Sequence, residues 1–168
     1  MFKKILLALL ALFLIIQLFR PEKNNSNDLT NAVTKKYDVP EEVSVILKNA
    51  CNDCHTNNTV YPWYANVQPV AWWIDEHVVD GKRHLNLSDF TNLPIAVQNH
   101  KFEEIVEVID ENEMPLESYT YLGMHQEAYL TAKEKEVLKT WAVKQMDYLK
   151  SSYPADSLIM KRRRPKNQ

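Results

Sequence analysis

Glycine and cysteine are scarce in this chain of 168 residues, which contains two of each. Two glycines are too few for nucleotide sites that hold phosphates on a glycine-rich loop. Two cysteines cannot form a four-cysteine zinc site, and no pair of histidines has the spacing of a zinc finger. No catalytic acid–base pair and no nucleophile constellation stands out in the sequence. We therefore expect a binding or carrier protein and not an enzyme.

Positive charge is concentrated at the two ends of the chain. Residues 1–20 and 161–168 hold eight of the 20 Lys+Arg, which leaves 12 against 22 Asp+Glu in between, a net charge of −10. This acidic middle argues against a nucleic-acid-binding face. It suggests instead that any docking partner is basic.

Both cysteines lie in the sequence Cys51-Asn52-Asp53-Cys54-His55, the attachment pattern of a c-type haem. Two thiols one helical turn apart can add to vinyl groups on one edge of a porphyrin. The imidazole that follows then lies next to the iron as its proximal axial ligand. We predict one covalent haem c on Cys51 and Cys54, with His55 on the metal.

Two other interpretations of the motif have weaker support. A dithiol redox site on a thioredoxin-like scaffold would follow a β-strand in a βαβ pattern, and no such strand is indicated. A zinc site would have to recruit two of the histidines.

Met114 is the candidate for the sixth iron position. A thioether is a soft donor that favours ferrous iron, and Pro115 restricts Met114 to an extended backbone on a loop between two helices. Met124 and His125 are the main competitors, and His100 is a weaker one. The iron is thus expected to have His/Met ligation.

Trp63 and Tyr64 are candidates for packing against the haem. They belong to an aromatic-rich loop that follows the attachment motif. Large flat side chains can wall a haem edge, although they fill ordinary cores equally well.

The amino terminus predicts a membrane anchor over residues 1–20. Lys3 and Lys4 precede an apolar run from Ile5 to Ile16, and no small-x-small cleavage site follows. We expect a single transmembrane helix whose basic end stays in the cytoplasm. The haem domain would then lie on the periplasmic side of a bacterial cytoplasmic membrane, where covalent haem attachment takes place.

The remainder of the chain predicts an all-α fold. Apolar residues at helical spacing indicate helices from Pro40 to the cysteines, from Pro69 to Gly81, from Lys101 to about Asn112, and from Thr131 to Ser152. Ser88 suggests a further short helix interrupted near Pro94. The helix after Thr131 is expected to pack across the first. We assign residues 21–38 to a polar linker, 39–152 to the haem domain and 153–168 to a basic, disordered tail.

A set of residues, most of them aromatic or proline, follows the attachment motif in a distinctive order. They are Asn58, Pro62-Trp63-Tyr64, Pro69, Trp73, His77, Gly81, Met114-Pro115 and Trp141. With them the chain resembles the bacterial haem-binding domain family of cytochrome c-like proteins, over residues 40–150. The resemblance implies a class I cytochrome c-like fold, haem on Cys51 and Cys54, and iron on His55 and Met114.

These features predict a membrane-tethered cytochrome that passes single electrons between extracytoplasmic redox partner proteins. The alternatives are a haem sensor or a small peroxidase-like enzyme with an open or displaceable sixth position, and a thiol redox module without haem.

Overall fold

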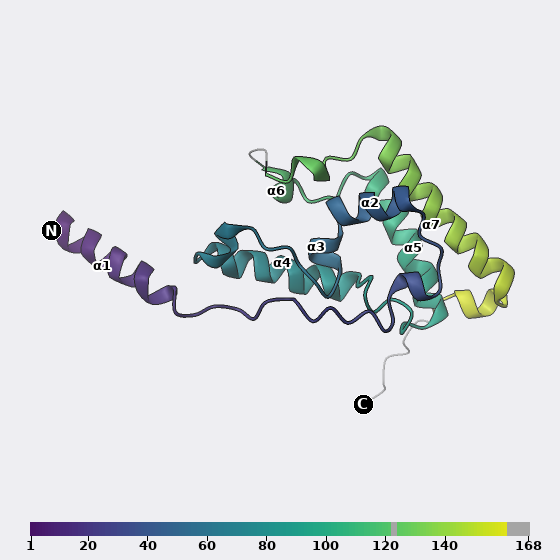
Figure 1. Cartoon of the computed structure of the whole chain (residues 1–168), viewed down its shortest axis with the longest axis horizontal. Coiled ribbons are helices and arrows are strands. Elements are labelled where there is room, and N and C mark those ends of the chain that lie inside the picture. The colour runs from purple at the N-terminus through teal and green to yellow at the C-terminus, as the bar shows by residue number, and fades with distance from the viewer. Residues whose placement is uncertain (122–123, 161–168) are drawn as a thin grey trace, which may run out of the picture.

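The computed structural model describes residues 1–121 and 124–160, and all regular elements in this part of the chain are helices. The all-α prediction is confirmed, whereas the class I cytochrome c-like arrangement stays a prediction. Figure 1 shows α1 extending away from a body formed by the other helices. The α-helices are α1 (Phe2–Ile16), α2 (Glu41–Ala50), α3 (Asn52–His55), α4 (Val70–His84), α5 (Ile95–Asp110), α6 (Glu117–Thr120) and α7 (Ala132–Ser152). The 3-10 helices are η1 (Val33–Lys35), η2 (Trp63–Asn66), η4 (Gln126–Ala128) and η5 (Ala155–Leu158).

The hydrophobic core lies where α7 packs along α5 and crosses α2. Phe102 of α5 is fully buried, and its ring is 5.5 Å from that of Trp141 in α7 and 4.9 Å from that of Tyr37. The indole Nε1 of Trp141 also donates to the Asp38 carbonyl at 2.8 Å, which satisfies its polar atom inside the core. The prediction that the last helix packs across the first of the haem domain is confirmed.

The helix before the haem motif is confirmed, but it does not carry both thiols. The α2 helix buries Val43, Ile46 and Leu47, as its apolar period predicts, and the chain leaves helical dihedral angles at Cys51. Cys54 and His55 lie on the separate single turn α3. The Thr56 hydroxyl ends that turn, because it donates to the Asn52 carbonyl at 2.7 Å in place of a backbone amide.

The α4 helix runs to His84, so the prediction that it ends at Gly81 is wrong. Gly81 is needed inside the helix because α4 approaches α3 closely at this point. A Cβ on Gly81 would lie 2.8 Å from the Cys54 carbonyl oxygen and 3.0 Å from the Cys54 Cβ. Gly81 therefore allows α4 to pack closely against the haem motif and does not end the helix.

The short helix expected at Ser88 is absent, and α5 begins at Ile95 instead of near Lys101. Ser88 Oγ accepts from the Asn57 amide at 3.0 Å and so ties two loops together instead of capping a helix. Pro94 provides the helix start, since its carbonyl accepts from the Val97 and Gln98 amides.

Residues 21–38 are part of the folded body, so their assignment as a polar linker is wrong. Val33 and Tyr37 are buried in the core. Asn24 Nδ2 donates to the Thr56 carbonyl at 2.8 Å and to Thr59 Oγ1 at 2.9 Å. The asparagines that suggested a solvated tether thus bind the loop after the haem motif.

The segment after α7 is also folded in its first part. Tyr153 and Leu158 pack against the core, so the disordered tail does not begin at residue 153. Residues 161–168, which hold the basic cluster, lie outside the described residues.

No helix within residues 1–121 and 124–160 is both long enough and apolar enough to span a membrane. The apolar segment forms α1, which has 15 residues and buries none of them. A helix of this length extends about 22 Å, against roughly 30 Å for the hydrocarbon core. The predicted transmembrane helix is therefore not found.

The capping box predicted at the start of α7 is confirmed, and it gives a first test of the fold. Thr131 Oγ1 accepts from the Glu134 amide at 3.2 Å, and the Glu134 carboxylate accepts from the Thr131 amide at 2.8 Å. We expect Thr131→Ala to lower the free energy of unfolding by about 1 kcal/mol, as loss of an N-cap does. Denaturant titration measures the change.

Thr140→Ala is the matched control, because Thr140 is exposed inside α7 and alanine has the higher helix propensity. It should leave stability unchanged or raise it slightly. Equal losses in the two variants would show that the box contributes nothing specific.

Candidate functional site

Two adjoining cavities surround the attachment motif. The first, here called the thiol cavity, has a volume of about 310 Å³ and is lined by Cys51, Cys54, His55, Met114 and residues of α4. The second, here called the α5 cavity, has a volume of about 530 Å³. It shares Cys51, His55 and Met114 with the first and adds side chains of α5, some apolar and some charged. The apolar ones are Ile105, Val108 and Ile109, and the charged ones are Lys101, Glu104 and Glu107. The predicted thiols, imidazole and thioether therefore meet at one hollow.

His55 is held by the segment that leaves α4. Its Nδ1 is 2.9 Å from the Leu85 carbonyl oxygen, and its own carbonyl accepts from the Leu87 amide at 2.7 Å. A carbonyl only accepts, so Nδ1 carries the proton and the lone pair remains on Nε2. Burial lowers the pKa of His55, which favours the neutral ring that a metal requires.

The two thiols do not have the electrostatics of a dithiol redox centre. Both cysteines are free, and burial raises the pKa of Cys51 to about 12 and that of Cys54 to about 11. Redox-active cysteines instead have lowered pKa values that favour the thiolate. The part of the chain that the structure describes also has no β-strand to form a thioredoxin-like βαβ unit. The thiol redox interpretation is therefore disfavoured.

Met114 lies on the loop after α5 and is partly buried against the core. The Val108 carbonyl near the end of α5 accepts from the Glu113 amide at 2.9 Å and from the Met114 amide at 3.3 Å, which fixes the start of this loop. Of the four ligand candidates, Met114 is the one that lines the two cavities that contain His55.

The other ligand candidates lie elsewhere. Met124 and His125 line a smaller, almost wholly apolar pocket of about 70 Å³ beside Cys54, here called the tyrosine pocket, and neither lines the thiol or α5 cavity. His125 Nε2 is within 3.2 Å of the Tyr64 hydroxyl. His100 pairs with glutamates of its own helix and lines none of the three spaces.

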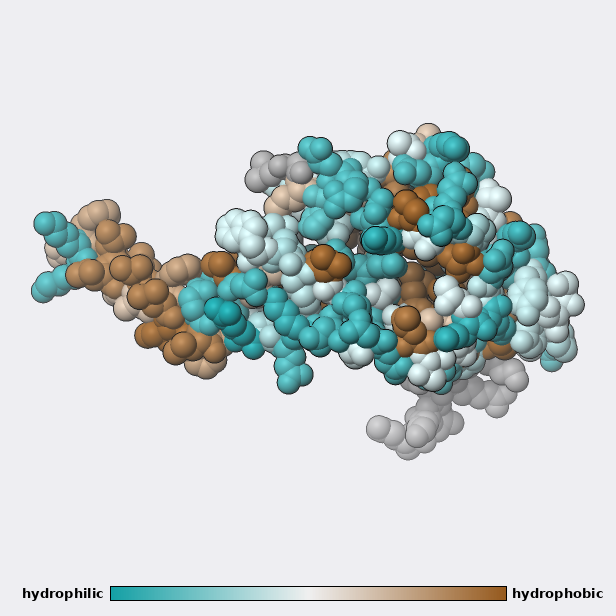
Figure 2. Space-filling view, in the orientation of Figure 1, coloured by the Kyte–Doolittle hydropathy of each residue, from teal (hydrophilic) through white to brown (hydrophobic). Residues whose placement is uncertain are grey.

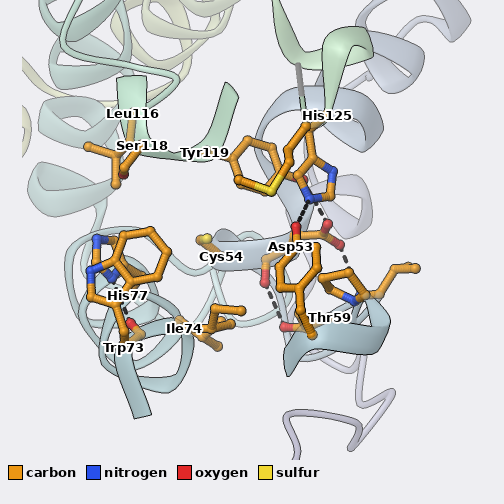
Figure 3. Close-up of a pocket in the computed structure, with 15 residues that line it drawn as sticks. Asp53, Cys54, Thr59, Trp73, Ile74, His77, Leu116, Ser118, Tyr119 and His125 are labelled. Atoms are coloured by element: carbon orange, nitrogen blue, oxygen red, sulfur yellow. Dashed lines mark hydrogen bonds between the residues drawn. The ribbon is translucent and has the colours of Figure 1, made fainter. Parts of the chain in front are cut away.

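The aromatic candidates separate in the structure. Tyr64 lines the tyrosine pocket, but Trp63 is 79% exposed and lines none of these spaces. Trp73 and His77 lie on the pocket wall contributed by α4, with ring centroids 4.5 Å apart (Figure 3). Of the two predicted aromatics, Tyr64 and not Trp63 therefore lies in the pocket beside the motif.

Asp53, between the two cysteines, is a structural residue that the sequence patterns did not reveal. Its carboxylate accepts from the Tyr119 hydroxyl at 2.8 Å and from the Val60 amide at 3.0 Å. Figure 3 shows Tyr119 and His125 side by side above Asp53, and their rings stack with centroids 4.1 Å apart. Burial raises the pKa of Tyr119, so its hydroxyl remains a donor. Asp53 thus ties the motif to α6, the short helix that follows Met114.

The chemistry of this donor set fits a haem. Two protonated thiols, an imidazole with a free Nε2 and a thioether meet at one hollow, and α5 supplies the apolar side chains Ile105, Val108 and Ile109. The described residues contain no group of three or more histidine, cysteine, aspartate and glutamate side chains that would bind a bare metal ion. The hollow therefore suits an iron that arrives in a porphyrin.

Comparison with known proteins agrees with this geometry. Residues 11–144 match the family model of the haem-binding domain. No curated protein and no solved structure gave a match. Since the match spans most of the chain and includes the attachment motif and Met114, this protein is a haem-binding protein that belongs to the haem-binding domain family.

Proposed function

We propose that the protein is a monohaem c-type cytochrome that carries single electrons. Cys51 and Cys54 would form the thioether bonds, His55 would bind the iron on one side and Met114 on the other. The observation that carries the proposal is that these four side chains line one cavity. A bound haem supplies the one-electron iron couple.

The chain's own residues would set the properties of that couple. The Leu85 carbonyl orients the His55 ring through Nδ1 and leaves Nε2 for the metal. The Met114 sulfur is a soft donor that favours the reduced state and raises the potential. Ile105, Val108 and Ile109 would place apolar side chains of α5 against the ring.

Replacement of Met114 tests the sixth ligand. We expect Met114→Ala to lose the low-spin thioether spectrum and to lower the reduction potential by on the order of 0.1 V, within the roughly 0.8 V range that axial ligands span. Optical and magnetic spectra of both oxidation states, together with a potentiometric titration, measure the change.

Met124→Ala is the matched control, because Met124 lines the tyrosine pocket and not the cavities that contain His55. It should retain the spectrum and potential of the unmodified protein. Unchanged properties in Met114→Ala would rule out this ligand. Tight carbon monoxide binding or peroxide turnover by the unmodified protein would contradict electron transfer and favour a sensor or peroxidase-like enzyme.

We also propose that the haem domain is attached to a membrane on the outer side of the cytoplasm, where it exchanges electrons with extracytoplasmic redox proteins. The support is the N-terminal segment. Every residue of α1 is unburied, and nine of its large apolar side chains are more than half exposed. A helix that is apolar on all sides and covers no core requires another apolar environment.

A further inference from the structure

The end of α1 is joined to the haem domain by a pair of glutamines. The Gln17 side chain accepts from the Gln68 amide at 2.9 Å and donates to the Gln68 carbonyl at 3.3 Å. Gln68 is itself 1% exposed, and its side chain donates to the Phe19 carbonyl. These contacts, here called the glutamine clamp, fix α1 against the segment that leads into α4 and replace the flexible tether expected at this point.

Of three exposed tryptophans, Trp63 and Trp72 lie next to the glutamine clamp, whereas Trp73 lines the tyrosine pocket. Trp63 is 79% exposed on η2, a few residues before Gln68, and Trp72 is 42% exposed on the first turn of α4. The Trp72 amide donates to Gln68 Oε1 at 3.3 Å, so the clamp and this helix start form one unit. Figure 2 shows the apolar α1 projecting from this end of the molecule. By contrast, Trp141 is 3% exposed in the core.

Two cations complete this end of the molecule. Arg20 Nε donates to the Gln17 carbonyl at 3.2 Å, and Lys23 Nζ donates to Asn66 on η2 at 2.9 Å while lying 4.1 Å from the centre of the Tyr61 ring. Neither forms an ion pair with a carboxylate of residues 1–121 or 124–160. Their charge is thus available to an anionic surface.

We propose that Arg20, Lys23, Trp63 and Trp72 form a collar that docks on the headgroup layer of an anionic lipid bilayer. Tryptophans favour the membrane–water interface, and cations near the surface are attracted to anionic lipids. The collar residues lie close to the contacts that hold the end of α1, and from Ile5 onward this helix is apolar on all sides, so lipid is the one occupant that suits both. The inference rests on the membrane attachment proposed above and extends it.

The consequence is a fixed orientation. The glutamine clamp sets the direction of α1 relative to α4, and α4 lines the thiol cavity through His77, Gly81 and His84. A collar held at the headgroups therefore presents the haem site at a constant height and angle, in the way that a partner fixed in the same membrane would require.

Fluorine NMR of the full-length, reduced holoprotein labelled with 5-fluorotryptophan tests the collar. The protein is placed in lipid nanodiscs of phosphatidylethanolamine and phosphatidylglycerol, with and without a lipid that carries a spin label at its headgroup. Single Trp→Phe substitutions assign the four resonances. We expect the spin label to broaden the Trp63 and Trp72 signals and to leave the Trp141 signal sharp.

The outcomes separate the collar from the membrane attachment. If the protein stays in the discs but Trp63 and Trp72 remain as sharp as Trp141, α1 alone holds the domain and the collar is wrong. If the haem protein is not retained by the discs, the attachment and the collar both fail, while the electron-carrier proposal stands. Broadening that depends on protein density and not on the lipid label would assign the surface to a second copy of the chain.

A clamp variant tests the orientation. We expect Gln17→Ala to remain in the discs and to show weaker broadening of Trp63 and Trp72, because α1 then loses two of its contacts with Gln68 and can swivel. Gln126→Ala, an exposed glutamine far along the chain, is the control and should keep the broadening. Equal broadening in both variants would overturn the role of the clamp.

Discussion

The double substitution Cys51→Ser, Cys54→Ser is expected to release all haem into acidified organic solvent, whereas the unmodified protein should retain its haem through denaturation. The reason is chemical, because a serine hydroxyl does not form the thioether bond. Without those bonds, only axial ligation and packing hold the porphyrin, and both disappear when the chain unfolds. Haem staining after denaturing electrophoresis measures the difference in protein made with the haem-attachment machinery.

Each single substitution should keep the haem bound through one thioether and change its alkaline pyridine spectrum. Ala50→Ser is a matched control, since Ala50 is half-buried and lines the thiol cavity beside Cys51, so this change places a serine hydroxyl next to the site while both thiols stay in place. It should retain covalent haem. A double variant that still holds haem through denaturation, or an unmodified chain that never does, would disprove c-type attachment.

The elements that the sequence predicts well are those whose signal is local. In α2 the apolar residues Val43, Ile46 and Leu47 recur along one face and are buried, whereas Val45 on another face is exposed. In α7 the capping box and the apolar period agree, and the helix begins and ends at the predicted residues. The attachment motif is also local, because both thiols must reach one edge of one ring.

The elements that the sequence misses depend on polar side chains with distant partners. Asn24 looks like part of a solvated linker, yet it bonds to the loop after α3. Gln98 is 2% exposed and bonds to the Thr91 and Leu93 carbonyls, which allows α5 to start before the predicted apolar stripe. Composition and periodicity carry no information on such contacts, because the partners come from other parts of the fold.

In the candidate site, too, the sequence predicts the local motif but not the contacts with distant residues. His55 follows from its place in the motif, but the bond that orients it comes from Leu85 beyond the end of α4. Asp53 is inside the motif, and its hydroxyl partner Tyr119 lies in the short helix α6, which no spacing rule connects to it. Sequence therefore predicts which groups are chemically suited to the iron, and the fold decides which of them share a cavity.

Gly81→Val is expected to destabilise the protein and to reduce haem incorporation, even though valine has the higher helix propensity. The first carbon of the new side chain would lie 2.8 Å from the Cys54 carbonyl oxygen, a backbone atom in the attachment turn. Either α4 or α3 must move, and overpacking of this kind costs typically 1–3 kcal/mol. Both helices line the thiol cavity, so a shift also displaces Cys54 and His55 from His77 and His84.

Gly81→Ala distinguishes the effect of the steric clash from the effect of helix propensity on stability. In an open helix interior this change would stabilise by about 1 kcal/mol, but here its Cβ meets the same carbonyl oxygen. We expect denaturant unfolding to show lower stability for Gly81→Ala and lower still for Gly81→Val, with a parallel fall in the haem-to-protein ratio. Val79→Ala, on the exposed side of α4, should leave the haem ratio unchanged. A rise in stability for Gly81→Ala would show that the close approach of α4 to the haem motif is not required, because the motif would then tolerate a side chain at this contact.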